Sequence, residues 1–305
     1  MNQEYNISII TVNYNGYEDT CSLIDSVVSN HIEAEIIVVD NGSKKDEASK
    51  IQTRYPFVKA IRSDENLGFA GGNNLGIKAA TGKYLFFLNN DTEFRGDATE
   101  INNGISSLIQ TLESSKTIGM VCPKIRFSWD DSPIQFAGYT PLSPITLRNA
   151  SIGYGEAERG QYNTAHPTPY AHGAAMMAKR EAVDSAGLMP ECYFLYYEEL
   201  DWSMMFKNAG YVIWYDPSLT IYHKESRSTG QNSPLKTYYL TRNRLLFIQR
   251  NIPRRLHIIS YLYMTLMVAP RDILKNIIKG DFAQLRSIRR GIYDFYTNRQ
   301  GYRKL

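Results

Sequence analysis

The chain has 305 residues, 43% of them hydrophobic and 21% charged, with a formal net charge of +3. This composition excludes a largely disordered chain, and the length suits one catalytic domain with an elaborated C-terminal part. The three cysteines form no CxxC pair, which argues against a structural zinc site and suits a reducing compartment.

The first third of the chain alternates short β-rich runs with helix-like segments. Strands are predicted at 7–12, 35–39, 58–62 and 84–88, and helices at 18–29 and 68–80. Alternation at this pitch predicts parallel βαβ units, in which helices cover both faces of a mostly parallel sheet. Farther on, 119–127 and 130–169 are richer in Pro, Gly and Ser, and part of this stretch fits a β excursion with long loops. Strands are then predicted at 174–179, 211–215 and 219–222, and helices at 180–186 and 198–209.

The end of the chain is basic. From Arg250 to Leu305 there are twelve Lys and Arg residues against three acidic ones, which indicates an anionic partner, either a membrane or a nucleic acid. Within this part, the apolar run from Ile258 to Pro270 is shorter than the about 20 residues that span a bilayer. It fits a core or dimer helix, or an amphipathic helix lying in the plane of an anionic membrane surface.

Polar residues follow several predicted strands at their carboxyl ends. Because those ends form the ligand-binding edge of a parallel sheet, Asn13, Asp40 and Asp91 should converge on one crevice. A carboxylate at the end of a buried strand is costly unless it is paired or bound to metal. A Mg²⁺ or Mn²⁺ ion between Asp91 and a diphosphate would relieve both charges. The same Asn89-Asn90-Asp91 stretch is also good turn chemistry, so the turn interpretation stays open.

Two further stretches carry candidate chemistry. Glu198, Glu199 and Asp201 begin a predicted helix, where the helix dipole favours carboxylates. Alternatively one of them faces the cleft as a general base, its pKa raised by the neighbouring aromatic residues. His223 ends a strand and precedes the polar stretch 224–232, so it is either a structural histidine or a metal ligand beside a mobile lid.

The stretch Asn66 to Gly76 is rich in glycine and leads into a helix. It matches neither a GxGxxG nor a P-loop pattern. Its backbone amides could still approach a phosphate or a ribose.

In their order and identity, these stretches resemble glycosyltransferase family 2, the inverting enzymes of GT-A fold, and most closely the bacterial rhamnosyltransferase-like branch. The matching stretches are IITVNYNG (9–16), IIVVDNGS (36–43), NLGFAGGNNLG (66–76), YLFFLNNDT (84–92), HGAAMMAKREAVDSAGLMPECYFLYYEELDW (172–202), YH (222–223) and YYLTRNRLLF (238–247). The resemblance implies an α/β catalytic domain of GT-A fold over 1–245, divided into a nucleotide-sugar half (1–118) and an acceptor half (119–245). A basic, helical C-terminal region (246–305) follows.

The resemblance also implies roles for individual residues. Glu199 would be the general base and Asp201 a second catalytic acid that shapes the acceptor site, which Gly173 and Trp202 would line. Asp91 and His223 would hold a divalent cation, Mg²⁺ or Mn²⁺, and Asp40 would bond the nucleobase. The residues expected around the nucleotide sugar are Thr11, Asn13, Asp40, Asn41, Asn66, Gly71, Gly72, Asn73, Asn89, Asn90 and Asp91.

Two residues depart from the family pattern. Asn89 stands where the family has the first Asp of its DxD motif, so binding of the metal should depend more on the diphosphate. Glu199 stands where Asp is more common, and it is chemically equivalent to Asp although one methylene longer.

The implied function is inverting transfer of a sugar from a dTDP- or UDP-sugar to a hydroxyl of a glycan or lipid-linked glycan. The setting would be bacterial surface polysaccharide or cell-wall synthesis, and the branch suggests dTDP-rhamnose as the donor. Since the first residues lack the pattern of a signal peptide, we expect a cytoplasmic protein, peripheral at the inner membrane face through its basic C-terminus. A homodimer through the C-terminal helices is a further expectation. No nucleic-acid-binding motif is recognised, so no nucleic acid partner is expected.

Two other functions compete with this one. A sugar-nucleotide pyrophosphorylase should have a Gly-rich loop with Arg or Lys after the first strand, where this chain has Asn13-Tyr14-Asn15-Gly16. A non-catalytic relative that binds a nucleotide sugar or a glycan is the second. The presence of Glu199, Asp91 and His223 argues against it, whereas Asn89 leaves room for it.

Overall fold

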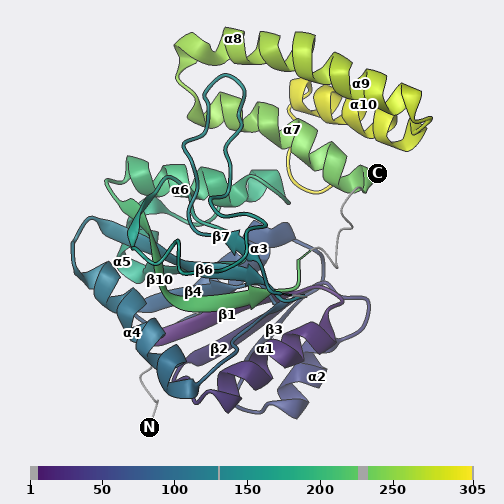
Figure 1. Ribbon diagram of the computed structural model, residues 1–305. Helices are drawn as coiled ribbons and strands as arrows, with labels where there is room; N and C mark the ends of the chain where they lie inside the picture. The colour runs from purple at the N-terminus through teal and green to yellow at the C-terminus, as the bar shows by residue number, and fades with distance from the viewer. Residues whose placement is uncertain (1–5, 130, 226–232, 304–305) are drawn as a thin grey trace.

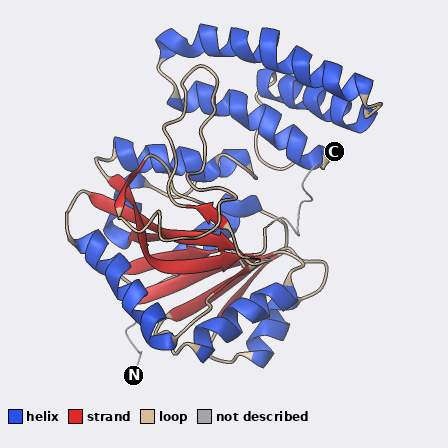
Figure 2. Cartoon of the chain, in the orientation of Figure 1, coloured by secondary structure: helices blue, strands red, loops and turns tan. Residues whose placement is uncertain are grey.

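The structure is a computed structural model that describes residues 6–129, 131–225 and 233–303. Figure 1 shows a central sheet with helices on both faces and a group of C-terminal helices stacked at one end. The separation of helices and strands is clearest in Figure 2. The predicted strand 84–88 and helix 180–186 have the predicted bounds, and the other predicted elements of the first 90 residues end within a few residues of expectation.

One mixed sheet forms the centre of the molecule. Its strands are β1 (Ile7–Asn13), β2 (Glu35–Asn41), β3 (Lys59–Ser63), β4 (Tyr84–Leu88), β5 (Thr92–Glu93), β6 (Ile118–Phe127), β7 (Ile134–Phe136), β8 (His166–Thr168), β9 (Ala175–Lys179) and β10 (Val212–His223). They are ordered β3-β2-β1-β4-β9-β6-β10-β5, with β7 paired to β6 and β8 to β10. The sheet is less parallel than predicted, because β9 runs antiparallel to both β4 and β6. The two strands predicted at 211–215 and 219–222 are one strand, β10, whose register against β6 shifts between Asp216 and Thr220.

Helices cover the two faces of the sheet. One face carries α1 (Tyr17–Ser29), α2 (Glu47–Arg54) and α4 (Ala98–Glu113), and the other carries α3 (Gly68–Ala79), α5 (Arg180–Ala186) and α6 (Glu198–Asn208). A short 3-10 helix, η1 (Glu191–Tyr193), precedes α6. The largest hydrophobic cluster lies between sheet and helices, with Phe87 of β4 packed edge-on against Trp202 of α6.

The glycines of α3 let this helix lie close to β1. A Cβ at Gly72 would stand 2.7 Å from Val12 Cγ1, and one at Gly76 would stand 2.4 Å from Ile10 Cγ2. Since real Cβ contacts are longer, only glycine permits this packing. Gly71 and Gly72 are buried inside the helix. The glycine-rich stretch therefore brings helix and strand together, and the place of these two residues at the donor stays a prediction.

The C-terminal helices form a second layer beyond α6. They are α7 (Pro234–Asn251), α8 (Arg254–Tyr263), the π-helical segment η2 (Met264–Val268), α9 (Ala269–Ile278) and α10 (Phe282–Tyr296). A boundary at residue 245 falls inside α7, so we place the start of the helical region at Pro234. Among the helices of the described residues, none combines the length and the apolar character needed to cross a membrane.

Candidate active site

The candidate site lies where the carboxyl ends of β1 and β4 meet. β1 lies between β2 and β4 in the sheet. The strand order therefore reverses at β1, and ligands of open α/β sheets bind at such a switch point. Gly16, which follows β1, leaves room for Asn90, since a Cβ at Gly16 would stand 2.5 Å from the Asn90 amide nitrogen. That amide also donates to the hydroxyl of Thr20 at 3.1 Å. These contacts close the edge between the two strands.

Asp91 and His223 come together at this edge from distant parts of the chain. His223 ends β10 and pairs with Thr92 of β5, which places its Nε2 at 3.1 Å from Asp91 Oδ1. Its other ring nitrogen, Nδ1, lies 2.8 Å from Oε1 of the buried Gln135 on β7. Because that amide oxygen accepts, Nδ1 carries a hydrogen, and Nε2 is the ring nitrogen that faces Asp91.

The Asp91–His223 pair has the chemistry of a divalent cation site. A carboxylate oxygen and an imidazole nitrogen whose tautomer is set by a second hydrogen bond are common metal ligands. Within the residues that the structure describes, no group of three or more His, Cys, Asp and Glu side chains is placed to hold a metal. Mg²⁺ typically takes one or two protein carboxylates and completes its shell with phosphate and water, which fits the single carboxylate of Asp91. Asn89, whose amide nitrogen lies 3.5 Å from His223 Nε2, adds no charge to the pair.

Glu199 lies beside this edge in the first turn of α6. A Cβ at Gly173 would stand 3.8 Å from Glu199 Cγ, so the absence of a side chain at Gly173 leaves space next to the carboxylate. The neighbouring Ala174 carbonyl accepts from the Asn89 backbone at 2.9 Å, which ties this segment to the end of β4. Burial raises the pKa of Glu199 above its ordinary value, as a general base requires.

Glu198, the residue before Glu199, is a buried acid. Burial, and after it the charge of Glu199, raises its pKa well above the ordinary value. One of its carboxylate oxygens has no hydrogen-bond partner. Two adjacent carboxyls in these surroundings disfavour double ionisation, and Glu198 is the one whose pKa the charge of its neighbour raises.

Two residues expected at the acceptor or catalytic site lie elsewhere. Asp201 is buried, and its Oδ2 lies 2.5 Å from Arg250 Nε of α7, so it joins α6 to the C-terminal helices. Trp202 is 0% exposed, and its indole nitrogen donates to the Gly187 carbonyl at 2.8 Å. Both side chains lie in the interior, and their roles toward an acceptor stay predictions. Asp201 links two helices, and Trp202 is part of the core.

Asp40 also has a structural position. It is 0% exposed and accepts hydrogen bonds from the backbone of Ser43, Glu47 and Ala48. Arg62 adds an ion pair of 2.9 Å to the same carboxylate. With both oxygens occupied, Asp40 anchors the turn after β2 in this structure, and its bond to a nucleobase stays a prediction.

The other side chains expected around the donor form the walls behind this edge. Asn13 is 0% exposed and links Thr20, at 2.8 Å, to Glu47, at 2.8 Å. Thr11 is equally buried, and its hydroxyl has no partner. Asn41 and Asn66 bond each other at 3.2 Å. The buried Asn73 donates to Phe69 within its own helix. The structure therefore brings Asn89, Asn90, Asp91, His223, Gly173 and Glu199 together, and it places the others in the support of that group.

Sequence reasoning missed two residues of the site. Gln135 contacts His223 across 88 positions in sequence, a separation that no local pattern can indicate. His172 stacks on Tyr139 and lies 6.5 Å from the His223 ring between centroids. Burial, and after it the nearby His223, lowers the pKa of His172 to about 3, so this ring stays neutral. Of the lid expected at 224–232, only Lys224 and Glu225 are among the described residues. Lys224 pairs with Asp19 at 2.8 Å.

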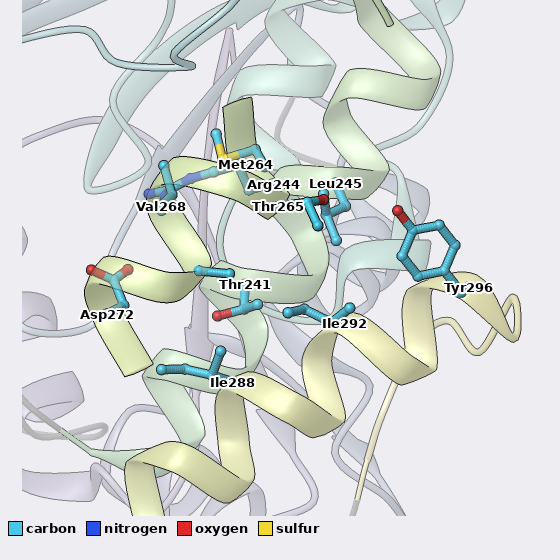
Figure 3. Close-up of a pocket in the computed structure, with 11 residues that line it drawn as sticks. Thr241, Arg244, Leu245, Met264, Thr265, Val268, Asp272, Ile288, Ile292 and Tyr296 are labelled. Carbon is cyan, nitrogen blue, oxygen red and sulfur yellow. The ribbon is translucent and has the colours of Figure 1, made fainter. Parts of the chain in front are cut away.

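A separate pocket lies among the C-terminal helices and contains none of these residues. Figure 3 shows it between α7, η2, α9 and α10, with Leu245, Met264, Val268, Ile288, Ile292 and Tyr296 among its lining. Its cavity volume is about 50 Å³.

The comparisons with known proteins identify the family. A sequence model described as "Glycosyl transferase family 2" matches residues 8–186, more than half of the chain. The chain belongs to glycosyltransferase family 2. This glycosyltransferase is 24% identical over 300 residues to the low-salt glycan biosynthesis hexosyltransferase Agl10 of Haloferax volcanii, covering 97% of this chain and 92% of that one. It is also 24% identical over 218 residues to N-acetylglucosaminyl-diphospho-decaprenol L-rhamnosyltransferase of Mycobacterium tuberculosis, covering 65% and 68%.

Solved structures agree in fold with this glycosyltransferase. The mannosyltransferase PcManGT of Pyrobaculum calidifontis, in complex with GDP-Man and Mn²⁺, has a TM-score of 0.58 at 12% identity, covering 97% of this chain and 88% of that one. GalNAc-T7 with UDP, GalNAc and Mn²⁺ has a TM-score of 0.59 at 16% identity, covering 88% and 57%. At these identities the likeness shows the fold alone. The predicted family and the GT-A-like α/β fold with a helical C-terminal region are thus confirmed.

Proposed function

We propose that this glycosyltransferase takes a sugar from a dTDP- or UDP-sugar and transfers it, with inversion, to a hydroxyl of a glycan or lipid-linked glycan. The observation that supports the proposal is the Asp91–His223 contact after β4, together with the position of Glu199 beside Gly173, whose neighbour Ala174 is bonded to Asn89. The relatives named above transfer sugars in glycan synthesis or to a lipid-linked acceptor, which supports the acceptor class. The proposed setting is bacterial surface polysaccharide synthesis at the cytoplasmic face of the inner membrane.

Glu199 acts on the acceptor in this proposal. Its carboxylate takes the proton of the acceptor hydroxyl while the oxygen forms a bond to the anomeric carbon. The bond from that carbon to the diphosphate breaks, and its electron pair leaves with the nucleoside diphosphate. The raised pKa of Glu199 gives the carboxylate the basicity for this step. Attack from the face opposite the leaving group inverts the anomeric carbon.

Asp91 and His223 act on the donor. When a divalent cation, Mg²⁺ or Mn²⁺, is held by these two side chains, it supplies charge stabilisation to the departing diphosphate. Gln135 contacts the other ring nitrogen, Nδ1, so Nε2 of His223 is the nitrogen that would face such a ligand. The titles of two structural neighbours name Mn²⁺ together with a nucleotide or nucleotide sugar, which supports a cation here.

The first test is a thermal-shift panel of nucleoside diphosphates and nucleotide sugars, each with Mn²⁺, Mg²⁺ or EDTA. A ligand that binds the native state raises the melting temperature by mass action, by an amount equivalent to about 2.7 kcal/mol at 100 times its Kd. We expect metal-dependent stabilisation by one nucleotide family, and loss of the metal dependence in Asp91→Asn. A flat panel with folded protein would support the non-catalytic alternative instead.

The second test separates binding from turnover. Glu199→Gln should retain the nucleotide-induced thermal shift but lose most release of nucleoside diphosphate, by a factor of about 100 or more. The matched control is Glu181→Gln, since this carboxylate is 69% exposed on α5 and outside the site. Equal turnover by Glu199→Gln and the control would refute the assignment of Glu199 as the base.

A further inference from the structure

The outer face of the helix pair α8–α9 is apolar and uncovered. Figure 1 places this pair at the end of the molecule away from the sheet. Ile258 is 72% exposed, Leu266 63% and Ile278 77%. Contiguous exposed apolar surface of this kind marks an interaction site in a soluble protein. We call it the outer apolar face, and its main residues are Ile258, Leu262, Leu266, Leu274, Ile277 and Ile278.

The π-helical segment η2 keeps these residues on one side. In an uninterrupted α-helix of about 3.6 residues per turn, Ile277 would be rotated by roughly 100° from Ile258. A π turn holds one extra residue and removes about that much rotation, so the two side chains share a face. The opposite side, with Ser260, Met264 and Val268, is buried. The helix pair thus has one face for the protein interior and one face for something else.

Basic residues border the outer apolar face. Arg254 and Arg255 begin α8, and Arg271, Lys275 and Lys279 accompany α9. The one acidic residue within 254–278 is Asp272, which pairs with Arg271 at 2.6 Å. An apolar stripe bordered by exposed Lys and Arg is the pattern of a helix that lies in an anionic membrane surface. A two-fold contact between copies would instead bring like charges together, because each copy presents the same patch.

We propose that the outer apolar face lies in the interface of an anionic lipid bilayer, with its helix axis along the membrane plane. The sequence left two interpretations of 258–270, a core or dimer helix and an amphipathic helix at a membrane surface. The buried side of the helix fits the first, and the exposed side fits the second. The excursion 139–150 connects this surface to the site, because Ser260 of α8 donates to the Pro144 carbonyl at 2.7 Å and Tyr139 stacks on His172. The inference concerns the C-terminal helices and does not depend on the catalytic roles proposed above.

The test is co-sedimentation of the full chain with vesicles of phosphatidylcholine alone and of phosphatidylcholine with phosphatidylglycerol. We expect binding to the anionic vesicles that weakens with salt. The triple variant Ile258→Gln/Leu266→Gln/Ile277→Gln should lose at least about tenfold in affinity. Its matched control is Phe57→Gln, an exposed apolar residue on the sheet domain.

A charge variant tests the contribution of the basic residues that border the outer apolar face. Lys275→Gln/Lys279→Gln should weaken binding by about tenfold or more, since each basic residue near an anionic surface contributes about 1 kcal/mol. Lys116→Gln, an exposed lysine beyond α4, is its control. Absence of binding by the wild type overturns the proposal, as does a dimer in light scattering that the triple variant converts to monomer. An unchanged nucleotide-induced thermal shift in the triple variant shows that any such failure concerns the membrane and not the donor site.

A second inference rests on a different observation, the backbone of the segment 193–197 that leads into α6. Three of its residues have positive φ without being glycine, with φ of 66° at Phe194, 68° at Tyr196 and 79° at Tyr197. Each such residue costs on the order of 1 kcal/mol and persists only when its surroundings hold it. Tyr197 is the residue before α6, so this segment decides where Glu199 lies.

Two buried residues of α7 hold that segment. The Asn243 amide nitrogen lies 3.1 Å from the Tyr193 carbonyl, 2.7 Å from that of Leu195 and 2.8 Å from that of Tyr196. Arg242 donates to the same Tyr193 carbonyl at 2.6 Å and to Asn243 Oδ1 at 2.9 Å. These side chains are 2% and 0% exposed, so their hydrogen bonds do not compete with water.

We infer that Arg242 and Asn243 are positioning residues, which act through the segment 193–197 to hold the Glu199 carboxylate beside Gly173. The inference rests on the proposed role of Glu199. It gives α7, which lies beyond the part matched by the family model, a function in the reaction. Alignment of a base within a fraction of an ångström is worth a large factor in rate, which is why a held segment matters.

The test is release of nucleoside diphosphate, with water as acceptor, from the nucleotide sugar that stabilises the protein most. Asn243→Ala should lower kcat at least about tenfold with little change in the donor KM, since losing these hydrogen bonds costs about 1–3 kcal/mol and loosens the base. Leu245→Ala, on the same helix but in another hydrophobic cluster, controls for loss of stability alone. It should keep kcat.

Three outcomes separate the interpretations. Unchanged kcat in folded Asn243→Ala, or equal changes in it and in Leu245→Ala, overturns the positioning role. If Asn243→Ala does not fold, Asn243→Ser, which keeps one donor, should show an intermediate loss, and unchanged kcat in that variant refutes the role as well. Full turnover by Glu199→Gln would instead refute the proposed function on which this inference rests.

Discussion

Replacing Gln135 by methionine tests whether the second hydrogen bond of His223 prepares it for a metal. Gln135 and His223 are 3% and 5% exposed, and the 2.8 Å contact between Oε1 and Nδ1 keeps the ring hydrogen on Nδ1. Methionine has nearly the same volume but accepts no strong hydrogen bond, so Gln135→Met removes the acceptor with little change in packing. With no acceptor left at Nδ1, the ring hydrogen is held at Nε2, which lies 3.1 Å from the accepting Asp91 carboxylate.

The magnitude follows from that exchange. Metal binding requires a free lone pair on Nε2, so in Gln135→Met the ring must return its hydrogen to an Nδ1 that has lost its partner. An unsatisfied buried donor costs about 1–3 kcal/mol. At about 1.4 kcal/mol per tenfold, the expected loss is about 10- to 100-fold in metal affinity, the range typical of residues that orient metal ligands. Without metal the protein loses little, because Asp91 accepts from Nε2 instead.

The assay is the Mn²⁺ concentration at half-maximal nucleotide-induced thermal shift, together with the melting temperature in EDTA. Gln135→Met should move the Mn²⁺ midpoint upward by about 10- to 100-fold while the EDTA melting temperature changes little. Gln135→Glu keeps an acceptor toward Nδ1 and should keep or lower the midpoint. Equal midpoints for wild type and Gln135→Met would refute the reasoning, and so would an equal loss in both variants.

Three other predictions follow from the site and its supports. Because burial raises the pKa of Glu199, kcat/KM should fall as the pH drops through that raised pKa. At pH values above the raised pKa, Glu199→Gln should be more stable than wild type, because the wild type then buries a charge. Below the ordinary pKa of Glu the two proteins should be equally stable, which urea melts at several pH values will show. Gly68→Ala should destabilise the protein by about 2 kcal/mol or more in urea melts, because φ is 76° there and the new Cβ would stand 2.2 Å from the Phe194 carbonyl oxygen. The control Gly210→Ala, where φ is also positive but no atom lies near the new Cβ, should lose only about 1 kcal/mol of stability. Asp201→Ala should cost about 1–3 kcal/mol in the same melts, less than a fully buried ion pair, since the guanidinium on α7 is 40% exposed; no change in stability would contradict the helix-linking role.

The apolar runs and the polar residues that follow them predicted the first four strands and the edge at which the site lies. Parallel pairing of β1 with β2 and β4 is enough to bring Asn13 and Asn89 to that edge. The sequence patterns did not predict the helix α4, Ala98–Glu113. Its interior includes Asn102, Asn103 and Gly104, which are weak helix formers, so packing of Ile101, Ile105 and Leu108 on the sheet stabilises it.

The roles of individual polar residues were harder to predict. Asp40, Asp201 and Trp202 belong to stretches that carry the resemblance, yet the side chain of each lies in the interior. The ion pair of Asp201 spans 49 positions and the hydrogen bond of Gln135 to His223 spans 88. Position in a motif therefore indicates the neighbourhood of a residue, and only tertiary contacts decide which way the side chain faces.

The excursion 139–150 also fixes the distance between the site and the outer apolar face. It begins beside His172 in the site and reaches α8 at Pro144, while Leu147 is buried among residues of α7, η2 and α8. If the lipid of an acceptor stays in a bilayer at the outer apolar face, the accepting hydroxyl must reach Glu199 along this fixed span. The protein would then measure how many phosphate and sugar units separate lipid from hydroxyl. The position of a sugar within a growing glycan would be chosen by distance from the membrane as well as by the shape of the pocket.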